Sequence, residues 1–179
     1  MLKHPESSYL PEPHKIEGSP KEAKEHFYEM ARTRIVYVTK EEMVEFGKQE
    51  TGEDESTTTG LYIRLPREKT TKEGVEKWID GLQIVINKDA FQQDGKDFSD
   101  LIPYAVEHEL YELWVKSKKG KSIQRTDKAH LLARQRQVEL ALRDKKLDKM
   151  IEFYTTLNPE YAQELDYARK KAERKSQKP

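Results

Sequence analysis

Residues 101–116, LIPYAVEHELYELWVK, contain the pattern that decides the fold. On a helical wheel with about 100° between successive residues, Leu101, His108 and Glu112 fall on one stripe, and apolar residues also occupy the other sides. Only Glu107 and the lysines near the end of this segment are expected to face water. A helix that is apolar on nearly all sides is surrounded by other elements. We therefore expect the central helix of the domain here, with two polar groups on its inward stripe.

The first half of the chain alternates helix and strand signals. Ser19 with Glu22, and Thr39 with Glu42, have the spacing of a capping box, so we expect a helix to begin at each pair. Residues 50–60, ETGEDESTTTG, contain no apolar residue and are expected to form an exposed loop. Short runs rich in β-branched and aromatic residues predict three strands: IVYV (35–38), GLYIRLP (60–66) and LQIVIN (82–87).

From Ser99 onward the pattern is helical. The predicted helices are SDLIPYAVEHELYELWVKSK (99–118), TDKAHLLARQRQVELALRDKK (126–146), LDKMIEFYTTL (147–157) and EYAQELDYARKKAERK (160–175). This order predicts an α+β fold, in which a small, mostly antiparallel sheet that includes residues 60–65 and 82–87 packs on helices. We expect three parts: an extended arm (1–18), a single α+β domain (19–158), and a C-terminal helix with a basic tail (159–179).

The composition narrows the classes of function. The 33 basic and 33 acidic residues give a formal net charge of zero, which argues against nucleic acid or an anionic membrane as a partner. The basic segments 116–125 and 169–178 lack interleaved aromatic residues and are interpreted as solvated. The lack of cysteine excludes disulfides, cysteine–zinc sites and thiol catalysis. No apolar signal segment or membrane-spanning stretch is present in the sequence, so we expect a soluble, cytoplasmic protein.

The polar residues of the central helix have the spacing of a metal site. His108 and Glu112 are four residues apart, so their side chains can converge on one point. A buried carboxylate is costly unless it is paired or bound to metal, and imidazole and carboxylate are both ligands of zinc. Glu109 projects to one side of that point, where it can accept a proton from a metal-bound water. The alternative is a core ion pair between His108 and Glu112.

His130 is the candidate for a third ligand. It lies near the middle of the apolar arc of the predicted helix at 126–146, and Arg134 and Gln137 share its stripe. A helix that packs only for stability would have leucine or isoleucine at these positions. The alternative is a core histidine with a hydrogen-bond partner. His26, on the first predicted helix, is interpreted as a surface or packing residue.

The segment VEHELYE (106–112) resembles the VxHELxH string of the zincins, a metallopeptidase-type fold built around a His-Glu-x-x-His helix. The strand LQIVIN precedes this helix, as an edge strand does in such domains, where it can pair with an extended substrate. The third candidate ligand lies on the following helix, as in the gluzincin type and in small peptidases related to phage-repressor-cleaving enzymes. The resemblance covers roughly residues 60–142.

This resemblance implies a metal-dependent hydrolase that acts on a peptide or protein. His108, Glu112 and His130 would hold zinc, Glu109 would be the general base, and Tyr104 or Tyr111 would hydrogen-bond a developing oxyanion. Glu112 stands where the family has its second histidine, and His130 stands where gluzincins have glutamate. The ligand set is still two histidines and one glutamate, with the positions exchanged.

Two further interpretations stay open at this point. The exchanged positions either preserve metal binding or leave an inactive zincin-like protein. An inactive or simply helical protein would serve as a protein–protein interaction module that uses its helices as docking surfaces, an interpretation that suits the balanced charge, the proline-containing arm, the acidic loop at 50–56 and the basic tail. His108, Glu112 and His130 are ionisable groups on the inward stripes of two predicted helices, and this placement favours the metal site. The metal content of the purified protein distinguishes these interpretations.

Overall fold

Six α-helices and two small sheets form the part of the chain that the structure describes. The computed structural model describes residues 19–50, 52–64, 82–118 and 127–177, and the predicted arm at 1–18 lies outside them. The α-helices are α1 (Pro20–Arg32), α2 (Lys40–Glu50), α4 (Ile102–Lys118), α5 (Asp127–Arg143), α6 (Leu147–Leu157) and α7 (Tyr161–Ser176). The strands are β1 (Ile35–Val38), β2 (Gly60–Arg64), β3 (Leu82–Asn87), β4 (Gln92–Gln93) and β5 (Lys96–Asp97), with the 3-10 turns η2 (Lys88–Phe91) and η3 (Ser99–Leu101). The predicted α+β fold with a helical second half is confirmed.

β3 is the central strand of the main sheet, whose order is β1-β3-β2. It pairs in parallel with β1 and antiparallel with β2, and β4 and β5 form a separate antiparallel pair. The expectation that LQIVIN is an edge strand is wrong, because β3 has a neighbour on each side, and β1 and β2 are the outer strands. Both faces of β3 are covered: Ile84 and Ile86 join the larger core and Val85 the smaller one. A strand buried on both faces is apolar at successive positions.

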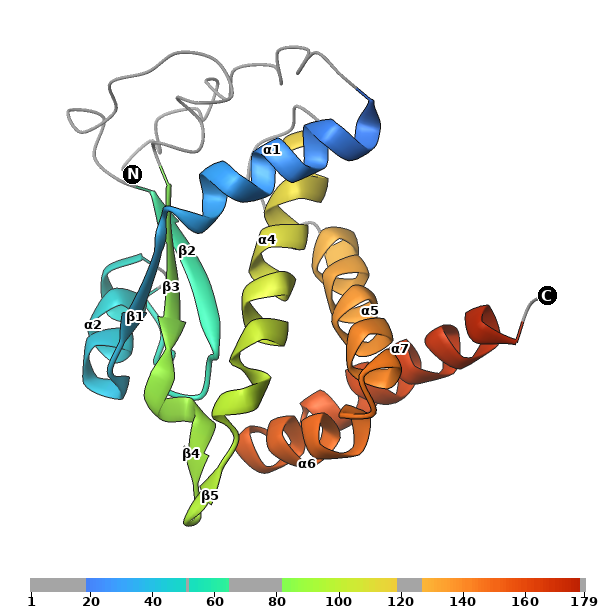
Figure 1. Cartoon of the computed structure of the whole chain (residues 1–179). Coiled ribbons are helices and arrows are strands. Elements are labelled where there is room, and N and C mark those ends of the chain that lie inside the picture. The colour runs from blue at the N-terminus through green and yellow to red at the C-terminus, as the bar shows by residue number, and fades with distance from the viewer. Residues whose placement is uncertain (1–18, 51, 65–81, 119–126, 178–179) are drawn as a thin grey trace, which may run out of the picture.

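The main sheet lies between α2 and α4 (Figure 1). Val38 and Val85 pack with Met43 of α2 on one face. On the other face, Ile84 and Ile86 share a core with apolar residues of α4 such as Leu110. α4 contacts β2, β3, α1 and α5, so the prediction that residues 101–116 form the central helix is confirmed.

Three helices follow one another outward from the sheet. α5 lies beside α4, and α7 packs against α5 (Figure 1). Leu165, Ala168 and Ala172 of α7 are buried in the larger core. Because α7 lies against α5, a side chain from α7 can reach the region between α4 and α5. Among the described residues, no helix has the length and the apolar character needed to cross a membrane.

Both predicted helix starts have capping-box geometry. Ser19 Oγ accepts a hydrogen bond from the Glu22 backbone N–H, and the Glu22 carboxylate accepts one from the Ser19 N–H. Thr39 and Glu42 exchange the same two bonds at the start of α2. These bonds satisfy backbone N–H groups that have no partner within the helix, so they fix where α1 and α2 begin.

Candidate metal centre

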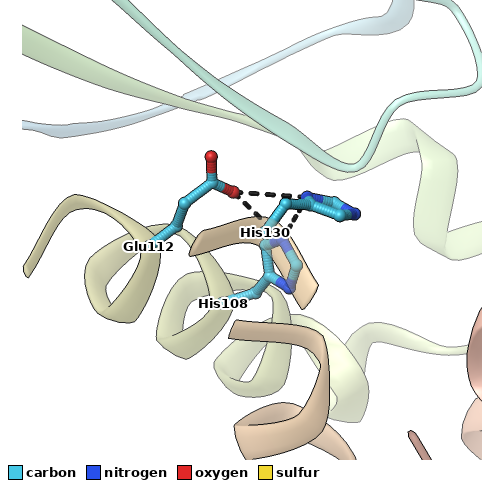
Figure 2. Close-up of side chains that lie close together, drawn as sticks. All are labelled: His108, Glu112 and His130. Atoms are coloured by element: carbon cyan, nitrogen blue, oxygen red, sulfur yellow. Dashed lines mark hydrogen bonds and ion pairs between the residues drawn. The ribbon is translucent and has the colours of Figure 1, made fainter. Parts of the chain in front are cut away.

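Two adjacent helices bring His108, Glu112 and His130 together (Figure 2). His108 and Glu112 lie one turn apart on α4 and are 4% and 7% exposed. His130 lies near the start of α5, and its ring is directed at the two residues of α4. The three residues that the sequence predicts as metal ligands therefore form one group.

The three donor atoms have the spacing of ligands around a small tetrahedral ion. Nε2 of His108 is 3.2 Å from Nδ1 of His130. Oε2 of Glu112 is 3.3 Å from Nδ1 of His130 and 3.5 Å from Nε2 of His108. Around tetrahedral zinc, with metal–ligand distances of about 2.05 Å, neighbouring donor atoms are about 3.3 Å apart. The residues therefore fit a metal ion, although the same distances also allow hydrogen bonds in the metal-free protein.

The three groups differ in their protonation. Burial lowers the pKa of His108 to about 4, so its imidazole is neutral at pH 7. Burial alone would raise the pKa of Glu112, but hydrogen bonds from the two histidines keep it far below its ordinary value. Burial also opposes the protonation of His130, yet hydrogen bonds to Glu112 and Glu164 outweigh it and raise the pKa of His130 to about 9. In the metal-free protein, His130 is therefore the protonated partner of Glu112.

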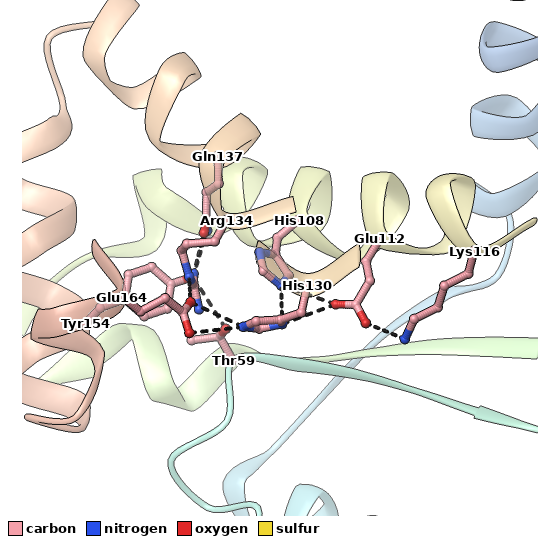
Figure 3. Close-up of polar contacts among 9 residues, drawn as sticks. All are labelled: Thr59, His108, Glu112, Lys116, His130, Arg134, Gln137, Tyr154 and Glu164. Carbon is pink, nitrogen blue, oxygen red and sulfur yellow. Dashed lines mark hydrogen bonds and ion pairs between the residues drawn. The ribbon is translucent and has the colours of Figure 1, made fainter. Parts of the chain in front are cut away.

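A second carboxylate, Glu164 of α7, completes the surroundings of His130 (Figure 3). Oε1 of Glu164 lies 3.2 Å from Nε2 of His130. With its proton on Nε2, His130 turns Nδ1 toward the candidate ligand atoms of His108 and Glu112. Arg134 also donates to this carboxylate. Burial alone would raise the pKa of Glu164, but the hydrogen bond from His130 and the charge of Arg134 lower it to about 2. Histidine ligands of zinc commonly bond a carboxylate through their second nitrogen, which fixes the ring.

If the group holds a metal ion, Glu164→Gln is expected to weaken its binding about 10- to 100-fold, because it removes the charged acceptor that orients His130. Glu160→Gln, a change at an exposed residue just before α7, is the matched control and should leave the affinity unchanged. Competition against a chelating dye measures both dissociation constants. Equal affinities in the two variants would show that Glu164 does not support His130 as a ligand.

Glu109 lies against the first residue of β2. It is 6% exposed, and a Cβ atom added at Gly60 would come within 2.9 Å of its Oε1. Glycine at this position therefore leaves the space that the carboxylate occupies. Burial and the charge of Glu112 raise the pKa of Glu109 to about 8. Because part of this shift comes from the charge of Glu112, a cation held by that ligand would favour the ionised form of Glu109.

Gly60→Ala is expected to destabilise the protein by about 1–3 kcal/mol, because the new methyl group overlaps the buried Glu109 carboxylate. In a Glu109→Ala background, the same change should be neutral or stabilising. There the carboxylate is absent, and alanine restricts the unfolded chain more than glycine does. Urea denaturation of the four proteins measures the difference. An equal cost in both backgrounds would mean that the overlap with Glu109 does not contribute.

The other candidates from the sequence do not join the group. His26 is exposed on α1. The Tyr104 hydroxyl donates to Oδ2 of Asp144 at 2.9 Å, and the Tyr111 ring lies beneath the Lys24 ammonium, 4.8 Å from it. Neither tyrosine hydrogen-bonds His108, Glu112 or His130 in the described contacts, so an oxyanion role for them stays an unsupported prediction.

Comparison of the chain with protein-family models, curated proteins and solved structures gives no match. The resemblance of VEHELYE to the zincin helix therefore stays a prediction from the sequence. We base the function on the chemistry of His108, Glu112 and His130, together with Glu109.

Proposed function

We propose that this protein is a metal-dependent hydrolase, a zincin-like peptidase with His-Glu-x-x-Glu in place of His-Glu-x-x-His. The observation that carries the proposal is the triangle of donor atoms from His108, Glu112 and His130, with Glu109 next to His108 on α4 and within reach of the charge of Glu112. The resemblance to the zincin helix supports a peptide or protein substrate. The outer strand β2 begins against Glu109, which also supports it.

Zinc is the ion that we propose for this group. Two imidazoles and one carboxylate match the donor set of catalytic zinc sites, which keep a fourth position open. Calcium and magnesium prefer sites built from oxygen atoms alone. The side chain of His130 is 39% exposed, in contrast to the buried residues of α4. This exposure gives solvent and substrate a route to the group.

The reaction that we propose is the attack of water on a carbonyl carbon. Bound zinc would supply a Lewis acid that polarises the carbonyl and lowers the pKa of water. A carboxylate oxygen of Glu109 takes the proton from the attacking water and later gives it to the leaving amine. Glu164 orients the ring of His130, and burial restricts the ring of His108, so both donor nitrogens stay in place.

The test is the metal content of protein that has been purified without chelators and without a histidine tag. We expect about one zinc per chain, measured by mass spectrometry. His108→Ala should lose this zinc, because it removes one donor of the triangle. The matched control is His26→Ala, which changes an exposed histidine on α1 and should keep the metal.

Wild-type protein that holds no zinc after incubation with the ion would contradict the proposal. His108, Glu112 and His130 would then be a buried ion-pair group, and the interaction-module interpretation would replace the hydrolase. Zinc that is retained in His108→Ala would also contradict it, because the ion would then bind elsewhere.

A further inference from the structure

Glu112 stands where the zincin pattern has its second histidine, so the group of His108, Glu112 and His130 carries one more negative charge than that pattern. Lys116 lies where it can neutralise this charge. His108, Glu112 and Lys116 follow one another at four-residue intervals on α4 (Figure 3). Nζ of Lys116 is 2.5 Å from Oε1 of Glu112, and the two side chains are only 5% and 10% exposed. Lys116 is the lysine that the described part of the chain buries. A buried ammonium is costly without a charged partner, and Glu112 is that partner.

The two oxygens of Glu112 have different partners. Oε1 accepts the hydrogen bond from Lys116. Oε2 lies 3.3 Å from Nδ1 of His130 and 3.5 Å from Nε2 of His108. Only Oε2 therefore faces the donor nitrogens, and the carboxylate is held in an orientation that presents one oxygen to the group.

We propose that Lys116 is a positioning residue that holds Glu112 as a one-oxygen ligand with its charge neutralised. This inference rests on the metal site proposed above. A neutral imidazole offers one donor atom and no charge, whereas a carboxylate alone offers two oxygens and a full negative charge. The Glu112–Lys116 pair has no net charge and presents one donor, so it takes the place of the histidine that the zincin pattern has at position 112.

A purely structural role predicts a different result. If Lys116 only offsets the burial of a carboxylate, its replacement changes stability but not how a bound ion is coordinated. If Lys116 keeps Oε1 away from the ion, its replacement lets both oxygens bind. Cobalt(II) reports this difference, because its visible absorption weakens as the number of ligands rises above four.

The first test compares cobalt-loaded wild type with Lys116→Met and Lys116→Arg. Lys116→Met should reduce the visible absorption at least twofold, because Oε1 is released to the ion. Lys116→Arg keeps a cationic donor and should retain most of the wild-type spectrum. Spectra of Lys116→Met and wild type that coincide would overturn the role of Lys116. Wild type without a cobalt spectrum would overturn the metal site as well, so the two failures are distinguishable.

The second test uses Glu112→His, which restores the histidine of the zincin pattern. With Lys116 present, this change places an ammonium beside an imidazole in place of a carboxylate, so cobalt should bind weakly. Adding Lys116→Met to Glu112→His should then tighten cobalt binding at least tenfold. In the wild-type background, where Glu112 is present, Lys116→Met should not tighten it. This double variant carries neither charge, so it stays informative even if Lys116→Met alone does not fold. Equal cobalt affinity with and without Lys116 in the Glu112→His background would overturn the inference.

Discussion

Glu109→Gln should lower peptide hydrolysis about 10²- to 10⁴-fold and leave the zinc content unchanged. The amide has nearly the shape of the carboxylate but cannot accept the proton of the attacking water. Glu109 is not one of the three donors, so the ion should be bound as before. Hydrolysis of a fluorescence-quenched peptide library and zinc analysis of the same samples measure the two effects separately.

In the metal-free protein, the same substitution should raise the thermal stability at high pH. The folded-state pKa of Glu109 is about 8, above the ordinary value of 4.5, because burial and the charge of Glu112 oppose ionisation. A group with a raised pKa contributes stability that is lost as the pH rises from the unfolded toward the folded value. Glutamine does not ionise and loses no stability in this way. The metal-free variant should therefore have a higher melting temperature than wild type at pH 8 and a similar one at pH 4. A lower melting temperature at pH 8, or loss of zinc together with activity, would contradict the assignment of Glu109 as the general base.

The central helix and the three donors are predictable from the sequence because their signals are local. The 3.6-residue period places His108 and Glu112 on one stripe of α4, and the run of apolar residues around them shows that the helix is covered. His130 stands out for the same reason, as a polar residue within an apolar arc. Their convergence between α4 and α5 is a tertiary contact, which the sequence only suggests and the structure brings about.

The supporting residues are not predictable in this way. Glu164 lies on α7, just before the basic segment 169–178 that the sequence predicts to be solvated, and its contact with His130 depends on how α7 packs against α5. Lys116 lies near the end of α4, where the sequence suggests exposure, but neighbouring elements bury it beside Glu112. The position of LQIVIN is missed because an apolar run shows that a strand is buried, without showing how many neighbours it has.

Zinc affinity should rise with pH from about pH 6 to pH 9, by at least about tenfold for each pH unit. The ion can bind only to deprotonated ligands, and His130 is the ligand that must lose a proton. Its pKa in the metal-free protein is about 9, because its hydrogen bonds to Glu112 and Glu164 outweigh its burial. His108, with a pKa of about 4, is already neutral over this range, and Glu112 is already ionised. Below the pKa of His130, each unit of lower pH makes proton competition tenfold stronger.

Titration of metal-free protein with buffered zinc across this pH range measures the slope. Glu164→Gln serves as a second check, because the hydrogen bond to Glu164 is one cause of the raised pKa of His130. In that variant, the affinity should become independent of pH at a lower pH than in wild type, even though the affinity on its plateau is weaker. A flat wild-type profile from pH 6 to pH 9 would exclude His130 from the ligand set. A slope near hundredfold per unit below pH 8 would show that Glu109 also releases its proton when the ion binds, as a general base beside a cation must.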